Sequence, residues 1–206
     1  MGTSTVIDIL GSMVVGGMLM LILWQMNDSA TKNLYNYGGE LVLQQNLAVT
    51  SQVLEYDFRK IGFCENWAKI VDPSNSILLA DSDKIKFLTD VHPDGDPDGN
   101  IDTLFYRLGP VTELSSTPNP RDRYLYRLIS SEEPKKINLG VTKFHLIYYD
   151  ALGDTIPFPI SYPVDTKTIN SVEINLTVED VSAYNNEYSS AIWRQIRLIS
   201  RNLKER

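Results

Sequence analysis

The first sixty residues constrain this chain most, because they join a long apolar stretch to a helical pattern. Residues 9–26 are almost entirely apolar and contain no proline. They run into residues 34–61, where apolar side chains recur at intervals of three and four. The pattern predicts one helix from Val6 to about Arg59, apolar near its N-terminal end and amphipathic beyond it.

The apolar stretch is close to the roughly 20 residues that a helix needs to cross a bilayer. A secretory signal peptide is one alternative, but no Lys or Arg precedes Lys32 and no small-residue cleavage site follows Trp24. A buried helix of a soluble domain is the other, but a helix apolar on all sides would need a much larger protein around it. The sequence favours insertion into lipid, or into a bundle of copies of the chain.

Several residues near this end are candidates for contacts between copies. Small residues at Gly11, Gly16 and Gly17 would allow another helix to approach closely. Leu21 and Trp24 belong to the apolar surface that such a bundle would bury. Asp8 has two interpretations that do not exclude each other: it caps the helix near its N-terminus, or it pairs with the N-terminal amine of a neighbouring subunit.

The lower part of the predicted helix has one apolar face, expected to pack on a following sheet. That face consists of Leu43, Leu47, Leu54, Phe58 and Ile61, with Val49 and Val53 widening it. The pair Gly38 and Gly39 interrupts the pattern and suggests a bend or local melting.

After Gly62 the period changes from helical to alternating. Residues 169–179 alternate cleanly, with Val172, Ile174 and Leu176 on the face expected to be buried and Ser171 and Glu173 on the exposed one. Further strands are predicted at residues 76–80, 84–89, 103–108, 124–129, 141–149 and 191–201. The fold class is therefore α+β, with a helix at residues 1–60 and an antiparallel β-rich head at residues 61–206.

Composition and motifs exclude several classes of function. The chain carries 26 acidic and 19 basic residues, and this net charge of −7 argues against nucleic acid as a partner of the bulk surface. The single cysteine, Cys64, has no partner for an intrachain disulfide, and His92 and His145 lack a paired acid at a recognisable spacing. Common catalytic and cofactor motifs are missing, so we expect no enzyme activity and no cofactor, with calcium as the one exception.

One acidic loop has the composition of a calcium site. Asp94, Asp96, Asp98 and Asp102 occupy loop positions 1, 3, 5 and 9, Gly99 stands at the turn position, and the Asn100 side chain adds another oxygen. The closing position carries Phe105 where a bidentate Glu is expected, and Pro97 stiffens the turn. A solvated acidic β-turn is therefore the favoured interpretation, and weak calcium binding the alternative.

Beyond the apolar N-terminal helix, two segments are distinctive: the helix exit from Leu54 to Gly62, with Asp57 and Arg59, and the tail from Arg194 to Asn202. With that helix, they resemble members of the type IV pilin superfamily, in particular minor pilins and the J-type pseudopilins of type II secretion. The helix exit is similar to the Asp-Leu-Arg-x-Ala-Gly exit of those proteins, and the tail is similar to their closing strand. The resemblance implies a helical spine, incorporation into a filament and a surface-exposed β head.

The same resemblance directs attention to the N-terminus. In the family, a peptidase cleaves after a glycine and an acid stands at the fifth mature position, which makes Met1 and Gly2 the candidate processing residues. In this chain the fifth residue is Thr5 and the nearest acid is Asp8. If Met1 is the first mature residue, Asp8 lies about one helical turn beyond the usual acid position.

The sequence thus predicts a structural subunit of a type IV pilus-like filament. Its partners would be copies of itself and other pilin-like subunits, with the bacterial inner membrane holding it before assembly and the head in the periplasm. The mature filament would be extracellular. The alternatives are a minor pseudopilin at the tip of a secretion pseudopilus, or a membrane-anchored periplasmic module that binds a ligand or calcium and never polymerises.

Overall fold

The structure is a computed structural model that describes residues 2–91, 97–130, 132–180 and 188–198. It begins with one long helix, α1 (Gly2–Arg59), so the predicted helix is confirmed, with its start four residues earlier than expected. Gly38 and Gly39 are both helical, which excludes the local melting that the glycine pair suggested. The chain forms two compact units, Met1–Val42 and Leu43–Arg206, because Leu43–Arg59 packs with the head.

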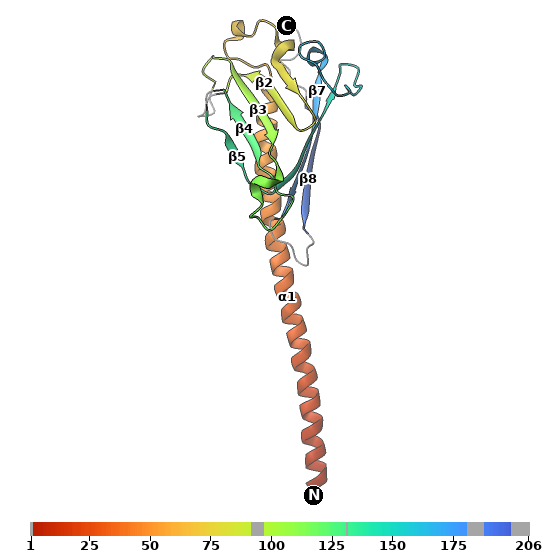
Figure 1. Cartoon of the computed structure of the whole chain (residues 1–206). Helices are drawn as coiled ribbons and strands as arrows, with labels where there is room; N and C mark the ends of the chain where they lie inside the picture. Colours follow the sequence, from red (N-terminus) through yellow and green to blue (C-terminus); the bar gives the residue numbers. More distant parts are fainter. Residues whose placement is uncertain (1, 92–96, 131, 181–187, 199–206) are drawn as a thin grey trace. The chain divides into compact units, whose positions relative to one another are not determined.

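The head contains two antiparallel sheets (Figure 1). The larger has the order β1-β2-β3-β4-β5, and the smaller has the order β6-β7-β8. The fold class is therefore α+β, as predicted. The strands of the larger sheet are β1 (Ile77–Ala80), β2 (Lys84–Thr89), β3 (Asp102–Leu108), β4 (Leu125–Ile129) and β5 (Lys135–Ile137). Those of the smaller sheet are β6 (Val141–Tyr149), β7 (Ser171–Glu179) and β8 (Ser190–Leu198).

Seven of these strands coincide with predicted ones, and β5 was not predicted. The short sequence Lys-Lys-Ile of β5 shows no alternation that would mark it as a strand. It forms because it lies at the edge of the larger sheet, where it pairs with β4 from Leu125 to Arg127. A neighbouring strand, and not its own sequence, gives this segment its conformation.

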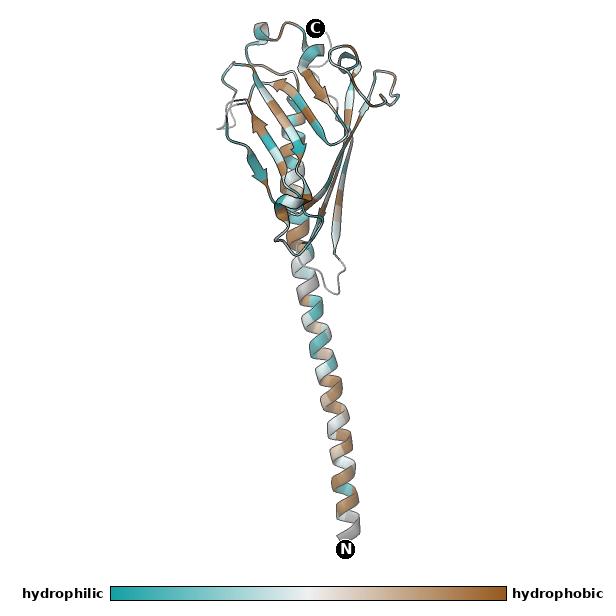
Figure 2. Ribbon diagram, in the orientation of Figure 1, coloured by the Kyte–Doolittle hydropathy of each residue, from teal (hydrophilic) through white to brown (hydrophobic). Residues whose placement is uncertain are grey.

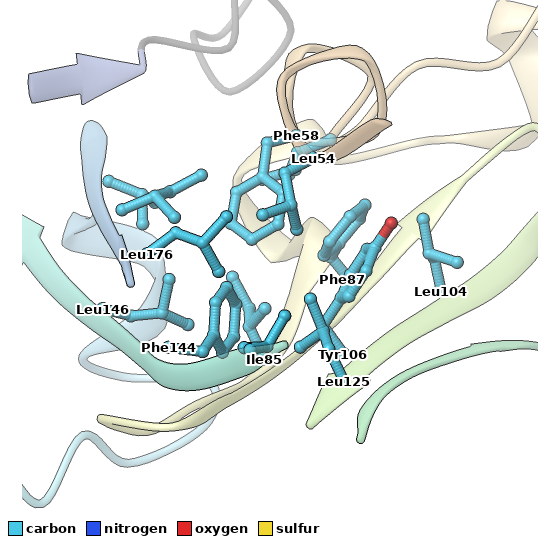
Figure 3. Close-up of a cluster of buried hydrophobic side chains, with 14 of the residues drawn as sticks. Leu54, Phe58, Ile85, Phe87, Leu104, Tyr106, Leu125, Phe144, Leu146 and Leu176 are labelled. Atoms are coloured by element: carbon cyan, nitrogen blue, oxygen red, sulfur yellow. The ribbon is translucent and has the colours of Figure 1, made fainter. Parts of the chain in front are cut away.

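One hydrophobic core joins α1 to both sheets (Figure 3). Leu54 and Phe58 of α1 are completely buried and point toward Phe87 of β2 and Leu176 of β7. Phe58 meets Phe87 edge-on, with ring centroids 5.6 Å apart. The predicted apolar face of the helix is confirmed, except that Val49 is 47% exposed and lies off the buried stripe.

The prediction that Ser171 and Glu173 would be exposed is wrong. Both are buried, although they lie on the face of β7 opposite Val172 and Ile174. The Glu173 carboxylate accepts hydrogen bonds from the Tyr149 hydroxyl (2.7 Å), Arg194 Nε (2.7 Å) and Asn175 Nδ2 (3.0 Å). Burial alone raises the pKa of Glu173, but these donors outweigh it and the pKa is lowered.

Candidate functional site

The N-terminal unit presents an apolar helix surface that no described part of the chain covers. Every side chain from Thr5 to Leu34 is exposed, and Figure 2 shows mainly hydrophobic residues on the part of α1 nearest the N-terminus. Leu21 is 61% exposed and Trp24 is 70% exposed. By length and composition this helix could cross a membrane. The structure therefore leaves a large apolar surface to be covered by lipid or by another molecule.

The small residues in this unit leave room for a close neighbour. A Cβ atom added at Gly11, Gly16 or Gly17 would meet no atom within 4 Å. Ser12, next to Gly11, donates to the Ile9 carbonyl at 2.9 Å, so its hydroxyl is satisfied within the helix. This segment thus combines an apolar surface with flat places where another backbone could approach.

Asp8 is exposed and lies in the second turn of α1, since the helix begins at Gly2. The first turn contains no acidic residue, so Asp8 lies one turn beyond the first, and its effect on the helix dipole stays a prediction. Within the described part of the chain, no cation lies at ion-pair distance from Asp8. Its pairing with a neighbour's amine stays a prediction. Gly2 is the first helical residue, and Met1 lies outside the described residues.

At the other end of α1, a buried ion pair fixes the helix to the larger sheet. Asp57 is completely buried, and Arg127 of β4 approaches it with Nε 2.6 Å from Oδ2 and Nη2 3.1 Å from Oδ1. The hydroxyl of Tyr106 on β3 also donates to Asp57 Oδ2. Three elements distant in sequence therefore meet at one carboxylate.

Electrostatics keep Tyr106 and Arg127 of this cluster in fixed protonation states. Burial raises the pKa of Tyr106 well above its ordinary value, and the charge of Asp57 adds to the effect. Burial alone would lower the pKa of Arg127, but hydrogen bonding to Asp57 outweighs it and the pKa is raised. Tyr106 thus stays a neutral donor and Arg127 a cation, so the cluster is suited to hold structure together and not to exchange protons near neutral pH.

A hollow of about 490 Å³ opens beside this cluster, between α1 and β5. Its walls include Val53, Tyr56 and Ile137. The charged groups that reach it are already paired: Asp57 with Arg127, and Lys135 with Glu132 at 3.3 Å. The hollow is therefore an apolar groove whose charged side chains are already in ion pairs.

A second buried carboxylate, Asp90, organises the C-terminal half of the acidic loop. Its oxygens accept backbone N–H groups from Glu65, Asp98 and Gly99, each at 3.0 Å. Gly99 has φ of +74°, a conformation that favours glycine at this turn. The Cys64 thiol lies 3.6 Å from Asp90 Oδ2, and burial raises the pKa of this thiol. Asp90 thus ties the loop to the segment that follows α1.

The described part of the predicted calcium site uses its oxygens within the protein. Asp98 accepts from the backbone N–H of Asn100 (2.8 Å) and from its Nδ2 (2.9 Å). Asn100 Oδ1, an expected calcium ligand, instead accepts a hydrogen bond from the ammonium group of Lys69 at 2.5 Å. Asp102 is the first residue of β3. Asp94 and Asp96 lie outside the described residues, and among the residues that are described no three His, Cys, Asp or Glu side chains gather as a metal site.

Sequence analysis did not identify Asp57, Arg127 or Asp90 as organising residues, although one signal was available. Asp57 falls three residues after Leu54, on the apolar face of the helix. A charge at such a position needs a buried partner. Its partner Arg127 and the carboxylate of Asp90 come from strands and loops whose contacts are set by the tertiary fold.

The chain matches no protein-family model, and no curated protein matches its sequence. A long apolar N-terminal helix followed by antiparallel sheets is compatible with a pilin-like fold.

Proposed function

We propose that this chain is a structural subunit of a type IV pilus-like filament. The observation that carries the proposal is the exposure of every side chain from Thr5 to Leu34, in a helix whose following turns are built into a folded head. A bilayer would cover the apolar surface before assembly, and helices of other copies would cover it afterwards. The head would lie in the bacterial periplasm first and on the filament surface later.

The driving force for such assembly is burial of the apolar side chains of α1. Each fully buried Leu or Met contributes roughly 1.5 to 3 kcal/mol relative to an exposed one. In lipid that gain is already made, so close packing at Gly11, Gly16 and Gly17 would have to favour helix contacts over lipid contacts. The subunit performs no covalent chemistry in this proposal.

Asp8 provides orientation in this proposal. An exposed carboxylate beside an apolar surface is costly to bury alone, so it would pair with the N-terminal amine of the next copy. The head would contribute contacts on the outside of the filament.

Leu21→Asp tests the proposal directly, with Leu21→Met as the matched control. A charge at position 21 should abolish filaments seen by negative-stain microscopy of sheared surface material, whereas methionine keeps the volume and polarity of the site and should preserve them. Near-UV circular dichroism of each purified full chain checks that the head is folded. Filaments formed by Leu21→Asp would refute the proposal.

The abundance of the chain in sheared material distinguishes a major subunit from a tip subunit. A major subunit would be the main protein of the fibre, and a tip-located pseudopilin would be scarce. A monomeric membrane protein, never found in a fibre and indifferent to Leu21→Asp, would instead favour the anchored binding module.

A further inference from the structure

The outer face of the larger sheet concentrates positive charge on an acidic protein. Lys84 of β2 pairs with Arg107 of β3, Arg107 pairs with Tyr126 of β4, and Tyr126 pairs with Lys136 of β5. One row across four strands thus carries three cations. Lys86 stands in the next row, where it pairs with Phe105. We call the surface around Lys86, Arg107 and Lys136 the basic face.

Aromatic rings hold two cations of the basic face, Arg107 and Lys136, in place. The Arg107 guanidinium lies over the Tyr126 ring, 4.1 Å from its centroid. Lys136 Nζ lies 5.3 Å from the centroid of Tyr124 and 5.7 Å from that of Tyr126. A stacked guanidinium keeps its N–H edges free for a carboxylate, and a held side chain loses less entropy when it binds.

Carboxylates of the same head neutralise little of this charge. Lys84 pairs with Asp81 at 3.2 Å, and Glu113 is engaged by the Tyr126 hydroxyl at 2.5 Å. Among the residues that the structure describes, no carboxylate lies within ion-pair distance of Lys86, Arg107 or Lys136. Like charges opposite each other in a sheet are destabilising; Asp81 offsets part of this cost at Lys84, and a carboxylate on Arg107 would offset the rest.

The chemistry of the face favours carboxylates over nucleic-acid bases as its partner. Bases bind to sheets by stacking on open aromatic rings. Tyr126, the central ring of this face, is only 4% exposed, with Arg107 over it; Phe105 and Tyr124 are partly exposed, but the net charge of −7 opposes a phosphate backbone. Acidic side chains are plentiful on the chain itself, which carries 26 of them and a net charge of −7. A second copy thus carries carboxylates of the kind that complement this face.

We propose that the basic face docks on an acidic surface of the head of a second copy of this chain. The inference rests on the proposed function, since it names a head contact that a filament would use. Two basic faces would repel each other, so the contact joins two different surfaces. A contact of that kind leaves one free basic face at the end of each complex, and it can continue as an open filament. The contact also overcomes the general repulsion between acidic subunits.

A photo-crosslinker on this face tests the proposal in the full-length chain in its membrane. Phe105, which is half-buried on the outer face between Lys86 and Leu128, is replaced by p-benzoylphenylalanine. Irradiation should give a covalent dimer, and mass spectrometry should place the second attachment in an acidic segment of another copy. A crosslink to nucleic acid or to a different protein, or no crosslink, would overturn the proposal.

Charge reversal supplies the second arm of the experiment. Lys86→Glu with Lys136→Glu should reduce the crosslinked dimer by about tenfold, because like charges would then face each other across the contact. The control is Lys143→Glu with Lys167→Glu, which changes the net charge equally at exposed positions elsewhere on the head. Equal losses in the two double variants, or none, would contradict docking by this face. If the charge-reversed variant does not fold, Lys86→Gln with Lys136→Gln removes the two charges without reversing them. The yield of crosslinked dimer should still be lower than with Lys143→Gln and Lys167→Gln.

The two proposals fail in different ways. Filaments that lack the crosslink would refute the docking contact and leave the filament proposal standing. A salt-sensitive crosslinked dimer in membranes that never produce fibres would refute the filament proposal and retain the docking contact.

Discussion

Helix α1 contains two regions that differ in what covers their side chains. From Thr5 to Leu34 every side chain is exposed, including Leu21 and Trp24. From Leu43 to Phe58 the apolar face is buried, and Leu54 and Phe58 have no exposed surface. One type of secondary structure thus forms an uncovered surface in the first region and part of a core in the second.

The difference follows from how apolar residues are arranged around the helix. In the first region they cover the whole circumference, so one sheet could not bury them. In the second they form a single stripe that matches the inner faces of two sheets. Changes in the second region should therefore alter the stability of the head, whereas changes in the first should alter only association with lipid or other copies.

Arg127→Met should produce the largest loss of stability, because it leaves the Asp57 carboxylate buried without a cation. Breaking a buried ion pair in this way costs about 3–5 kcal/mol. For a chain of this size the Tm should fall by roughly 6–20 °C. Thermal unfolding of the full chain in detergent, followed by near-UV circular dichroism, measures the change.

Arg59→Met is the matched control, because Arg59 also pairs with a carboxylate near the end of α1. Its bond to Glu55 is 2.5 Å long, but the two side chains are 59% and 37% exposed. Exposed pairs contribute about 0–1 kcal/mol. Similar losses for Arg127→Met and Arg59→Met would show that Asp57 does not anchor the helix.

Leu54→Ala and Leu21→Ala test the two regions of α1 with the same substitution. Removing the buried Leu54 side chain should destabilise the head by about 2–5 kcal/mol, since it leaves a cavity in the core. Leu21→Ala should leave head unfolding unchanged, because Leu21 is 61% exposed. The same unfolding assay compares them, and a large loss from Leu21→Ala would break the distinction between the regions.

Most of the fold could be predicted from the sequence because it rests on local periodicity. The stripe from Leu43 to Ile61 and the alternation in β7 each specify their own element and buried face. Short β5 carries no such pattern, and it forms through pairing with β4. The burial of Glu173 was also missed, since its donors Tyr149 and Arg194 come from neighbouring strands that alternation within β7 does not reveal.

The site residues were less accessible to sequence analysis for a related reason. The apolar helix was predictable because its length, composition and periodicity are local properties of the sequence. The role of Asp57 depends on Arg127, which lies 70 residues further along the chain. The role of Asp90 depends on the backbone N–H groups of the turn at Asp98 and Gly99. Only their burial, required by the tertiary fold, turns these ordinary carboxylates into anchoring groups.

Asp122→Asn extends the comparison to a carboxylate that is buried like Asp57 but lacks its partners. Asp122 is 1% exposed, and neither side-chain oxygen has a hydrogen-bond partner. Burial raises its pKa above the ordinary 3.8, the nearby Thr117 hydroxyl lowers it in part although that hydroxyl donates to the Leu114 carbonyl at 2.8 Å, and the charge of Glu179 raises it. The folded chain therefore favours the protonated form, so the ionised group costs stability once the pH rises through the folded pKa.

Replacing Asp122 by the neutral amide should stabilise the head at pH 7, because it removes the cost of ionising a carboxyl whose pKa is raised, about 1.4 kcal/mol for each unit of that rise. At pH 3, below the ordinary pKa, the parent carboxyl is protonated in both states and the gain should vanish. Unfolding in urea at the two pH values measures the difference. A gain of the same size at both would show that charge is not the cause.

Labelling of the Cys64 thiol tests the contrast between covered and uncovered regions chemically, and we expect it to involve the smallest effect on stability. Its thiol is buried beside Asp90, and burial raises its pKa above 9.0. Maleimide should label it slowly, because the thiolate is the reactive form and the side chain is covered. In a Cys64→Ala background, Ser29→Cys places a thiol on an exposed turn of α1 and should react much faster. The labelling rate of Cys64 should also rise only at a higher pH than that of Ser29→Cys. Equal rates for the two thiols would mean that the head opens as readily as the uncovered helix, and the contrast between covered and uncovered regions would then be lost.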